Sequence, residues 1–311
     1  MTTAKTAAEH SVHSTRAAFA SVSVALVLLI AKAWAAYRTD STAMLGSLAD
    51  TALDVIASLT TLAGVRIAAV PADHDHRFGH GKAEALVALA QVALITVSAG
   101  GILWRAVDRL MTGSQTQAME DGIVVSVLAI ALTFALLWYQ RRVIARTGSV
   151  AIKTDNIHYE SDLFLNGSVI VALVLDQALH LSGADAVFGI GIALWLLWGA
   201  FRASSESIHQ LMDREWPEDE RQEFLDAAAE YDELRGLHDL RTRKSGTLRF
   251  VQFHVWVPAD WTVQEAHDRL DEAEEELQKR FPDTEILIHV DPEGQTDRET
   301  LLPQEITEQA S

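Results

Sequence analysis

The sequence predicts a membrane all-α domain, a bundle of six transmembrane helices, followed by a smaller α+β domain. Hydrophobic residues make up 49% of the 311 residues, yet the mean hydropathy is only +0.11. Such a mixture indicates an apolar membrane part joined to a charged soluble part. Much of the net charge of −18 comes from the acidic stretch after Asp213, so the excess acid belongs mainly to the soluble part.

Six apolar segments are long enough to cross a hydrocarbon core of about 30 Å, which needs about 20 helical residues. They cover residues 17–37, 42–70, 82–111, 121–141, 151–175 and 184–205. The second and fifth contain ionisable residues, so we expect both to score poorly in a simple hydropathy window. No small-residue cleavage site follows the first segment. We therefore interpret it as a retained helix behind a polar cytoplasmic tail of residues 1–14.

Basic residues predict how the six-helix domain, residues 15–210, lies in a membrane. The second and fourth connections carry most of them, namely Arg66, Arg77 and Lys82 in the second and Arg141, Arg142, Arg146 and Lys153 in the fourth. The fifth connection, residues 176–185, contains neither Lys nor Arg. The positive-inside rule therefore places the second and fourth connections and both termini in the cytoplasm.

The pattern after Met212 predicts a cytoplasmic α+β domain over residues 211–293. A charged helical stretch, 217–231, precedes a hairpin of 236–243 and 247–257 around Lys244, Ser245 and Gly246. Apolar residues alternate along the second strand, which predicts one buried face of Val251, Phe253, Val255 and Val257. An amphipathic helix, 263–281, and a short strand, 284–290, complete the order α-β-β-α-β, which suggests helices on one face of a sheet. The polar residues 294–311 are expected to be disordered.

Composition excludes several kinds of site. The strongly acidic balance argues against a nucleic-acid partner, because binding phosphate requires basic patches. The chain has no cysteine, which excludes disulfides and thiolate metal sites. Any metal must therefore be held by His, Asp and Glu.

Two pairs of ionisable residues lie inside the second and fifth apolar segments, each at a spacing of four. Asp50 and Asp54 share one face of one helix, and His158 and Asp162 share one face of the other. An ionised side chain near the bilayer centre costs at least ~2.5–3.5 kcal/mol, so such residues normally face a partner or a water-filled path. Three carboxylates and one imidazole match the ligands of a tetrahedral divalent-metal site.

The predicted topology places both pairs at a similar depth. Counting 1.5 Å per residue puts the aspartate pair roughly 12–18 Å from the outer surface and the other pair roughly 10–17 Å from the inner one. Asp155 continues the polar face of the fifth helix, and Ser58 that of the second. The alternative is that the aspartates pair with Lys32 for structural reasons, although Lys32 can extend toward the interface more easily.

Two further groups could bind metal. The second connection contains Asp73, His74, Asp75, His76 and His80, although a solvated polar loop is the alternative and spacing alone does not choose the ligands. The tail domain contains scattered candidates: His238, His254, His267, His289 and Asp291. Each of these histidines, taken alone, is more readily explained as an ordinary surface or core residue than as a metal ligand. The second and last strands could nevertheless place two of the imidazoles side by side.

The chain closely resembles the cation diffusion facilitator family, and within it the bacterial zinc transporters. The most specific stretches are SLADTALD (47–54), PADHDHRFGHGKAE (71–84), HYESDLFLNG (158–167), LHDLRTRKSG (237–246) and LIHVDP (287–292). The resemblance covers nearly all of residues 16–292. It implies a metallochaperone-like, ferredoxin-like tail fold and a homodimer. Val290 departs from the pattern, since relatives commonly have Gln there, and this could weaken the second tail metal.

The resemblance also implies roles for particular residues. These are a transport site at Asp50, Asp54, His158 and Asp162; a loop site at Asp73, His76 and His80; a two-metal tail site at His238, His254, His267, His289 and Asp291; a charged pair of Lys82 and Asp213; and an apolar gate at Ile157. The resemblance implies that His74 and Asp75 do not bind the metal.

We therefore expect a dimeric Zn²⁺/H⁺ antiporter of the bacterial inner membrane that exports zinc by alternating access and is not an enzyme. Zn²⁺ would be both its substrate and a structural or regulatory ligand. Metal binding must compete with protons, because neutral imidazole and ionised carboxylate are the forms that bind metal. The alternatives are an exporter mainly of Fe²⁺, Cd²⁺ or Mn²⁺, a membrane metal sensor, and an integral-membrane metallohydrolase, which lacks a clear general base.

Overall fold

A computed structural model describes residues 2–39, 42–112, 123–179, 184–282 and 284–294 of the chain. By its internal contacts the chain divides into two compact units. One unit is His10–Ile208, and the other combines Met1–Glu9 with His209–Ser311. The predicted disordered segment, apart from residue 294, lies outside the described residues.

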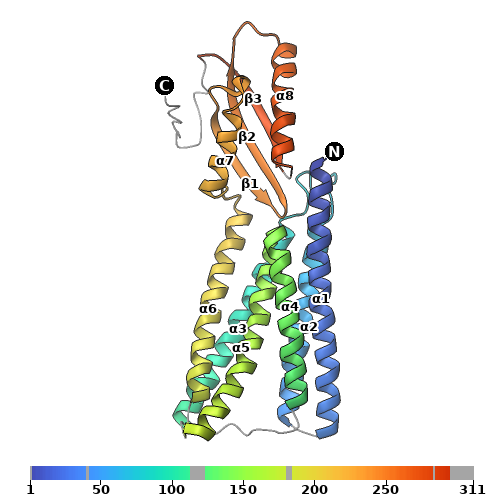
Figure 1. Ribbon diagram of the computed structural model, residues 1–311, viewed down its shortest axis with the longest axis vertical. Helices are drawn as coiled ribbons and strands as arrows, with labels where there is room; N and C mark the ends of the chain where they lie inside the picture. Colours follow the sequence, from blue (N-terminus) through green and yellow to red (C-terminus); the bar gives the residue numbers. More distant parts are fainter. Residues whose placement is uncertain (1, 40–41, 113–122, 180–183, 283, 295–311) are drawn as a thin grey trace. The chain divides into compact units, whose positions relative to one another are not determined.

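The larger unit is built from six long helices that run side by side (Figure 1), although residues 2–9 of the first and 209–211 of the last fall in the smaller unit. They are α1 (Thr2–Thr39), α2 (Thr42–Ala68), α3 (Ala83–Thr112), α4 (Ile123–Thr147), α5 (Val150–Leu179) and α6 (Ala184–Leu211). Each overlaps one of the six predicted segments. The predicted polar tail is helical from Thr2 onward, because its residues include Ala, Lys and Glu, which favour helix.

Five of these helices are long and apolar enough to cross a membrane, as judged on the described part of the chain. The second helix qualifies over Asp50–Ala68, so the expectation that it would score poorly was wrong. Apolar residues around Asp54 outweigh the acids there. Helix α5 is not among the five, because few of its side chains after Phe164 are described and the described stretch is too short to be judged; the expectation for this helix stays a prediction. It nevertheless contacts α2, α3 and α4 within the bundle.

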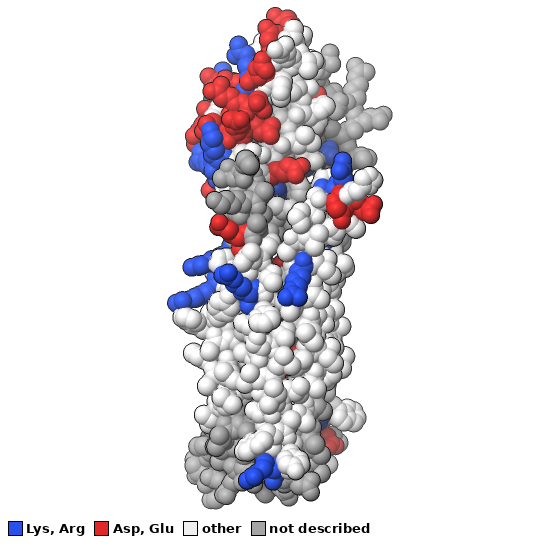
Figure 2. Space-filling model, turned by 90° about the vertical axis from the view of Figure 1, so that its right-hand side faces the viewer, with Lys and Arg blue, Asp and Glu red and all other residues white. Residues whose placement is uncertain are grey.

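The surface of the helical unit has the character of a membrane-facing bundle. Figure 2 shows charged side chains gathered toward its ends, with a broad and largely uncharged band between them. Large apolar side chains are exposed on several helices, among them Trp34, Val97, Trp104 and Phe201. Contiguous apolar surface of this kind is typical of an interface with lipid or protein.

The smaller unit has the predicted order α-β-β-α-β. Its elements are α7 (Glu218–Ala228), β1 (His238–Ser245), β2 (Leu248–Val257), α8 (Val263–Arg280) and β3 (Thr284–Pro292), with a short 3-10 turn at Asp232–Leu234. The sheet order is β1-β2-β3, so β2 is central; it pairs antiparallel with β1 and parallel with β3. The fold class predicted from the sequence is confirmed.

The turn of the hairpin lies later in the chain than predicted. Ser245 pairs with Leu248, so the two-residue turn consists of Gly246 and Thr247. Gly246 has φ +61°, a conformation that glycine adopts without the steric cost of a Cβ. Glycine at the first turn position is typical of tight hairpins.

The core of the smaller unit lies between the sheet and its helices. Alternate residues of β2 face it, as predicted: Val251, Phe253, Val255 and Val257 are all buried. Leu277 of α8 is completely buried in the same cluster. The opposite face of β2 carries Gln252 and His254 together with the aromatic residues Phe250 and Trp256.

We expect Leu277→Ala to destabilise this unit by about 2–5 kcal/mol, because truncating a buried leucine removes apolar contacts and leaves a cavity. Amide hydrogen exchange of β2 in the purified full-length protein measures the free energy of local opening. Val263→Ala is the matched control, since Val263 is 89% exposed. A change within about 0.5 kcal/mol is expected there. Equal effects of the two substitutions would contradict the assignment of this core.

Candidate metal centres

Helices α2 and α5 bring together Asp54, His158 and Asp162. Nε2 of His158 lies 3.1 Å from Oδ1 of Asp54 and 4.0 Å from Oδ2 of Asp162. One potential ligand atom from each residue lies within 4.8 Å of the others. All three side chains are only partly buried, so an ion could reach them. One imidazole and two carboxylates form a donor set that suits a tetrahedral divalent cation.

Asp50 lies one turn before Asp54 on α2, but its side chain is exposed and does not belong to the group of three. Three protein ligands leave one position open on a four-coordinate ion, for Asp50 or for water. The next residue, Thr51, accepts a hydrogen bond of 2.6 Å from Nζ of Lys32. The ammonium group therefore lies close to the same stretch of α2.

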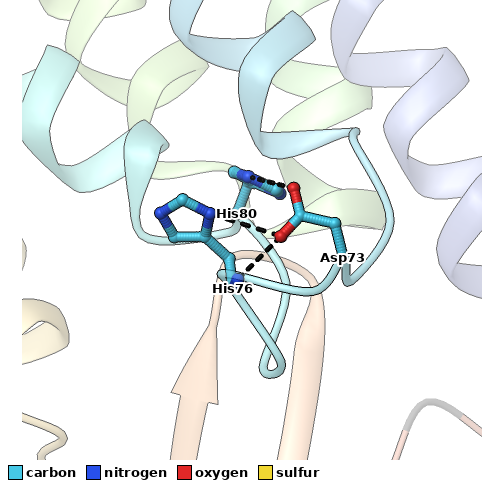
Figure 3. Close-up of side chains that lie close together, drawn as sticks. All are labelled: Asp73, His76 and His80. Carbon is cyan, nitrogen blue, oxygen red and sulfur yellow. Dashed lines mark hydrogen bonds and ion pairs between the residues drawn. The ribbon is translucent and has the colours of Figure 1, made fainter.

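The connection between α2 and α3 forms a second group (Figure 3). Nδ1 of His76 lies 3.4 Å from Oδ1 of Asp73, and Nε2 of His80 lies 3.5 Å from Oδ2 of the same carboxylate. The two imidazole rings are 4.4 Å apart between centroids. His74 and Asp75 lie outside this group and are 99% and 87% exposed.

The loop itself orients the Asp73 carboxylate. Its Oδ1 accepts backbone hydrogen bonds of 2.7 Å from His76 and 3.0 Å from Asp75. Gly79 permits the tight return of the chain with φ +75° and donates its N–H to the carbonyl of His76. The backbone N–H of His76 is the main reason that the pKa of Asp73 lies below its usual 3.8, and the charges of His80 and His76 also lower it.

A third group lies on the face of the small sheet that β2 turns away from the core. His238 pairs with His254 across β1 and β2, and His254 pairs with His289 across β2 and β3, so three imidazoles form a row. Oδ2 of Asp291 lies 3.2 Å from Nε2 of His238 and 2.9 Å from Nδ1 of His254. Its Oδ1 lies 3.5 Å from Nε2 of His289. The predicted contact between His254 and His289 is confirmed.

Local backbone geometry positions His238 in this row. The β1–β2 pairing is irregular between His238 and Arg241, as in a β-bulge, which re-aims side chains. Asp239 has φ +50°. Nδ1 of His238 lies 2.8 Å from the carbonyl of Gly236, which leaves Nε2 directed at Asp291. Each carboxylate oxygen of Asp291 thus faces imidazole nitrogen, as a ligand shared by two metals would.

Other predicted residues lie apart from these groups. His267 is exposed on α8 and is not part of the tail group. Ile157 packs against a buried apolar cluster of α3 and α6. Asp213 has φ +54° and lies 3.7 Å from a guanidinium nitrogen of Arg243. The roles of Lys82 with Asp213 and of Ile157 stay predictions.

Comparison with known proteins identifies the class. The model of the cation efflux transmembrane domain matches residues 18–212, and that of the cation efflux protein cytoplasmic domain matches residues 216–293. The chain therefore belongs to the cation efflux family, also called the cation diffusion facilitators. It is a multi-pass membrane transporter of cations.

The curated relatives narrow the resemblance to one type. The cation-efflux pump FieF of Cronobacter sakazakii is 43% identical over 278 residues, 89% of this chain and 92% of its own. FieF of Shewanella oneidensis is 44% identical over 273 residues, 88% of this chain and 92% of its own. A solved structure of the Zn form of CzrB is 38% identical and covers 28% of this chain and 99% of its own, with a TM-score of 0.25 that is too low to support a structural argument. The matched relatives are transporters, as expected for a chain that is not an enzyme.

Sequence reasoning missed one set of residues beside the α2–α5 group. Asp155 was seen only as part of a polar face, and Ser21, Thr61, Gln91 and Gln140 were not singled out. The signal was nevertheless present, since Gln91 and Gln140 are polar amide residues inside two of the predicted apolar segments.

Proposed function

We propose that this protein exports Zn²⁺ from the cytoplasm in exchange for protons. It would act as a homodimer in a bacterial inner membrane, with both termini in the cytoplasm. The observation that carries this proposal is the group formed by Asp54, His158 and Asp162 between two membrane helices. The relatives' description as cation-efflux pumps supports the direction of transport.

The donor set favours zinc as the substrate. Imidazole nitrogen together with carboxylate oxygen suits Zn²⁺, whereas sites made only of oxygen suit Mg²⁺, Ca²⁺ or Mn²⁺. His158 supplies that nitrogen, and its Nε2 is the atom nearest to both carboxylates. Selectivity over Fe²⁺ and Cd²⁺ would depend on geometry, because affinity order alone does not select among such ions.

Proton coupling follows from the chemistry of the same three ligands. They bind an ion as neutral imidazole and ionised carboxylates, so metal and protons compete for them. Asp54 belongs to one helix and both other ligands to another, so relative movement of α2 and α5 would change the distances between donor atoms. Such a movement would release the ion on the outer side, where protons take its place.

The loop and tail groups are proposed as regulatory or structural zinc sites. Asp73, His76 and His80 form the loop site; His238, His254, His289 and Asp291 form the core of a two-metal tail site, with His267 as a predicted further ligand. Occupancy of the tail site would stabilise the dimer. The match of residues 216–293 to the cytoplasmic-domain model, abbreviated ZT_dimer, supports that assembly.

The test is Zn²⁺ flux in proteoliposomes that contain the purified protein. With a pH gradient imposed in the coupling direction, zinc should accumulate against its own gradient, and collapse of the pH gradient should stop accumulation. Competition by Mn²⁺, Fe²⁺ and Cd²⁺ measures selectivity. Zinc flux unaffected by the pH gradient would exclude antiport, and absence of flux with every metal would favour a sensor.

The pKa of Asp73 leads to a prediction for the loop site. Because that pKa is lowered, the ionised carboxylate contributes to loop structure at all pH values above its usual range, and the contribution is lost only as pH falls through the lowered value. Asp73 therefore stays ionised between about pH 7 and about pH 5.5. We expect Asp73→Asn to weaken zinc binding at both pH values.

Chelator-competition titration measures this effect in a chain that also carries Asp54→Asn and Asp291→Asn, which silence the other two groups. Asp75→Asn is the matched control, since Asp75 is 87% exposed and outside the group. A penalty from Asp73→Asn that disappears at the lower pH would show that the carboxyl itself titrates in this range.

A further inference from the structure

The carboxylate of Asp155 lies fully buried in the helical unit and is surrounded by hydrogen-bond donors. Oδ2 accepts from Oγ of Ser21 at 2.7 Å and from Nε2 of Gln140 at 2.8 Å. Oδ1 accepts from Nε2 of Gln91 at 3.1 Å and from Oγ1 of Thr61 at 3.4 Å. Each oxygen therefore meets one glutamine amide and one hydroxyl.

The four donors come from four different helices. Ser21 belongs to α1, Thr61 to α2, Gln91 to α3 and Gln140 to α4. Each amide also donates to the hydroxyl beside it, at 3.0 Å between Gln140 and Ser21 and at closer range between Gln91 and Thr61. None of the five side chains is more than 1% exposed. We call this set of five residues the Asp155 clamp.

The clamp is costly for a purely structural device. Burying a carboxylate demands that its lone pairs be satisfied, and well-packed apolar residues often stabilise a core as well or better. Oε1 of Gln91 is buried and has no hydrogen-bond partner among the described residues, which adds to the cost. Ionisable groups inside membrane helices are by default functional.

The clamp lies one turn from the α2–α5 group. Asp155 precedes His158 by three residues on α5, so both lie on nearly the same side of that helix. Tyr159, next to His158, adds contacts to the same helices: its hydroxyl lies 2.8 Å from Oγ of Ser58 on α2 and 3.2 Å from the carbonyl of Ser21 on α1. The rotation and depth of α5 are thus fixed where it presents its metal ligands.

We propose that the Asp155 clamp positions His158 and Asp162 against Asp54, and so sets the affinity of the transport site for its cation. Asp155 is a positioning residue here and does not bind the ion. This inference rests on the proposed function. Loss of groups that orient metal ligands typically costs about 10–100-fold in affinity, which sets the effect to be expected.

The test uses Asp155→Asn, which keeps the shape of the side chain but replaces one accepting oxygen by a donor. One glutamine amide then faces another N–H group, and the geometry of the clamp is lost. We expect the KM for Zn²⁺ in proteoliposome flux to rise about tenfold, the lower end of the range for orienting groups, with a smaller change in kcat. Lys153→Gln is the matched control, because it removes another α5 contact, the 2.5 Å ion pair with Glu206.

Combining Asp155→Asn with Gln91→Glu should restore the KM. The introduced amide would donate to the introduced carboxylate, so the exchange returns a complementary pair with the same total charge. A chain damaged only in its fold would not be rescued by this second buried substitution. Wild-type KM in Asp155→Asn, or an elevated KM in the double variant, would overturn the proposal.

A milder variant keeps the proposal testable if Asp155→Asn does not fold. Thr61→Val removes one hydroxyl of the clamp, and we expect the KM to rise by about three- to tenfold, one orienting contact having been lost. A KM equal to that of the wild type would count against the clamp. Absence of zinc flux in the wild type itself would instead contradict the proposed function, so the two failures can be told apart.

Discussion

Asp54→Asn is expected to lower the initial rate of pH-driven zinc flux by about 100-fold or more. Oδ1 of Asp54 is the carboxylate atom nearest to Nε2 of His158, at 3.1 Å, and the amide removes a charged ligand from α2. Substitution of groups that only support metal ligands already costs about 10–100-fold, so loss of a direct ligand should reach or exceed the upper figure. Stopped-flow measurement with a zinc-sensitive dye inside the liposomes provides the rate.

Asp108→Asn is the control for this experiment. Asp108 is also an acid on a membrane helix, α3, but its side chain is exposed and lies outside all three groups. Its substitution should leave the rate within about twofold, as expected for a surface change away from the site. Asp50→Asn is a separate test, since a large loss there would make Asp50 the fourth ligand. Flux that survives Asp54→Asn would place the ion path elsewhere.

Asp291→Asn is expected to remove zinc from the tail domain. Zinc flux should persist in this variant and should still be lost when Asp54→Asn is added. Asp291 is the residue that the tail histidines share, with its two oxygens facing His238 and His254 on one side and His289 on the other. We expect the affinity of the tail site for zinc to fall by about 100-fold or more. Loss of a group that only supports a metal ligand already costs about 10–100-fold, and Asp291 is proposed to bind the metal directly. Metal analysis of the purified protein measures the zinc retained per chain.

Dimerisation is measured on the same samples by analytical ultracentrifugation in detergent. The proposed role predicts that Asp291→Asn raises the dimer dissociation constant, because metal that stabilises the dimer is lost. Asp239→Asn is a matched control, since Asp239 lies outside the group and asparagine tolerates its positive φ. Unchanged dimerisation after complete loss of tail zinc would show that the tail site has another role.

The helices and their paired ligands could be predicted because both depend on local patterns. Apolar length defines a spanning helix, and a spacing of four residues puts Asp50 with Asp54 and His158 with Asp162. Which helices are neighbours is not local information. The Asp155 clamp was therefore missed, because it joins one residue from each of five helices.

The tail domain shows, for a sheet, the same limit of prediction from local patterns. Alternation along β2 predicted its buried face and hence the opposite placement of His254. The exact row of His238, His254 and His289 required the register of both pairings. A bulge in β1 and the position of the Gly246 turn decide the first of them, whereas the parallel pairing of β2 with β3 depends on how the chain returns through α8. His267 belongs to α8, whose apolar periodicity indicates which of its faces packs against the sheet but not how far its exposed residues lie from the row of histidines.

The row of histidines makes metal binding dependent on strand register. A slip of one residue between β1 and β2 would turn His238 to the opposite face of the sheet and separate it from His254 and Asp291. Only the correctly paired hairpin then offers the full set of donors. An ion that binds there selects that pairing by mass action, so zinc in the cell would act on the tail domain as a folding ligand.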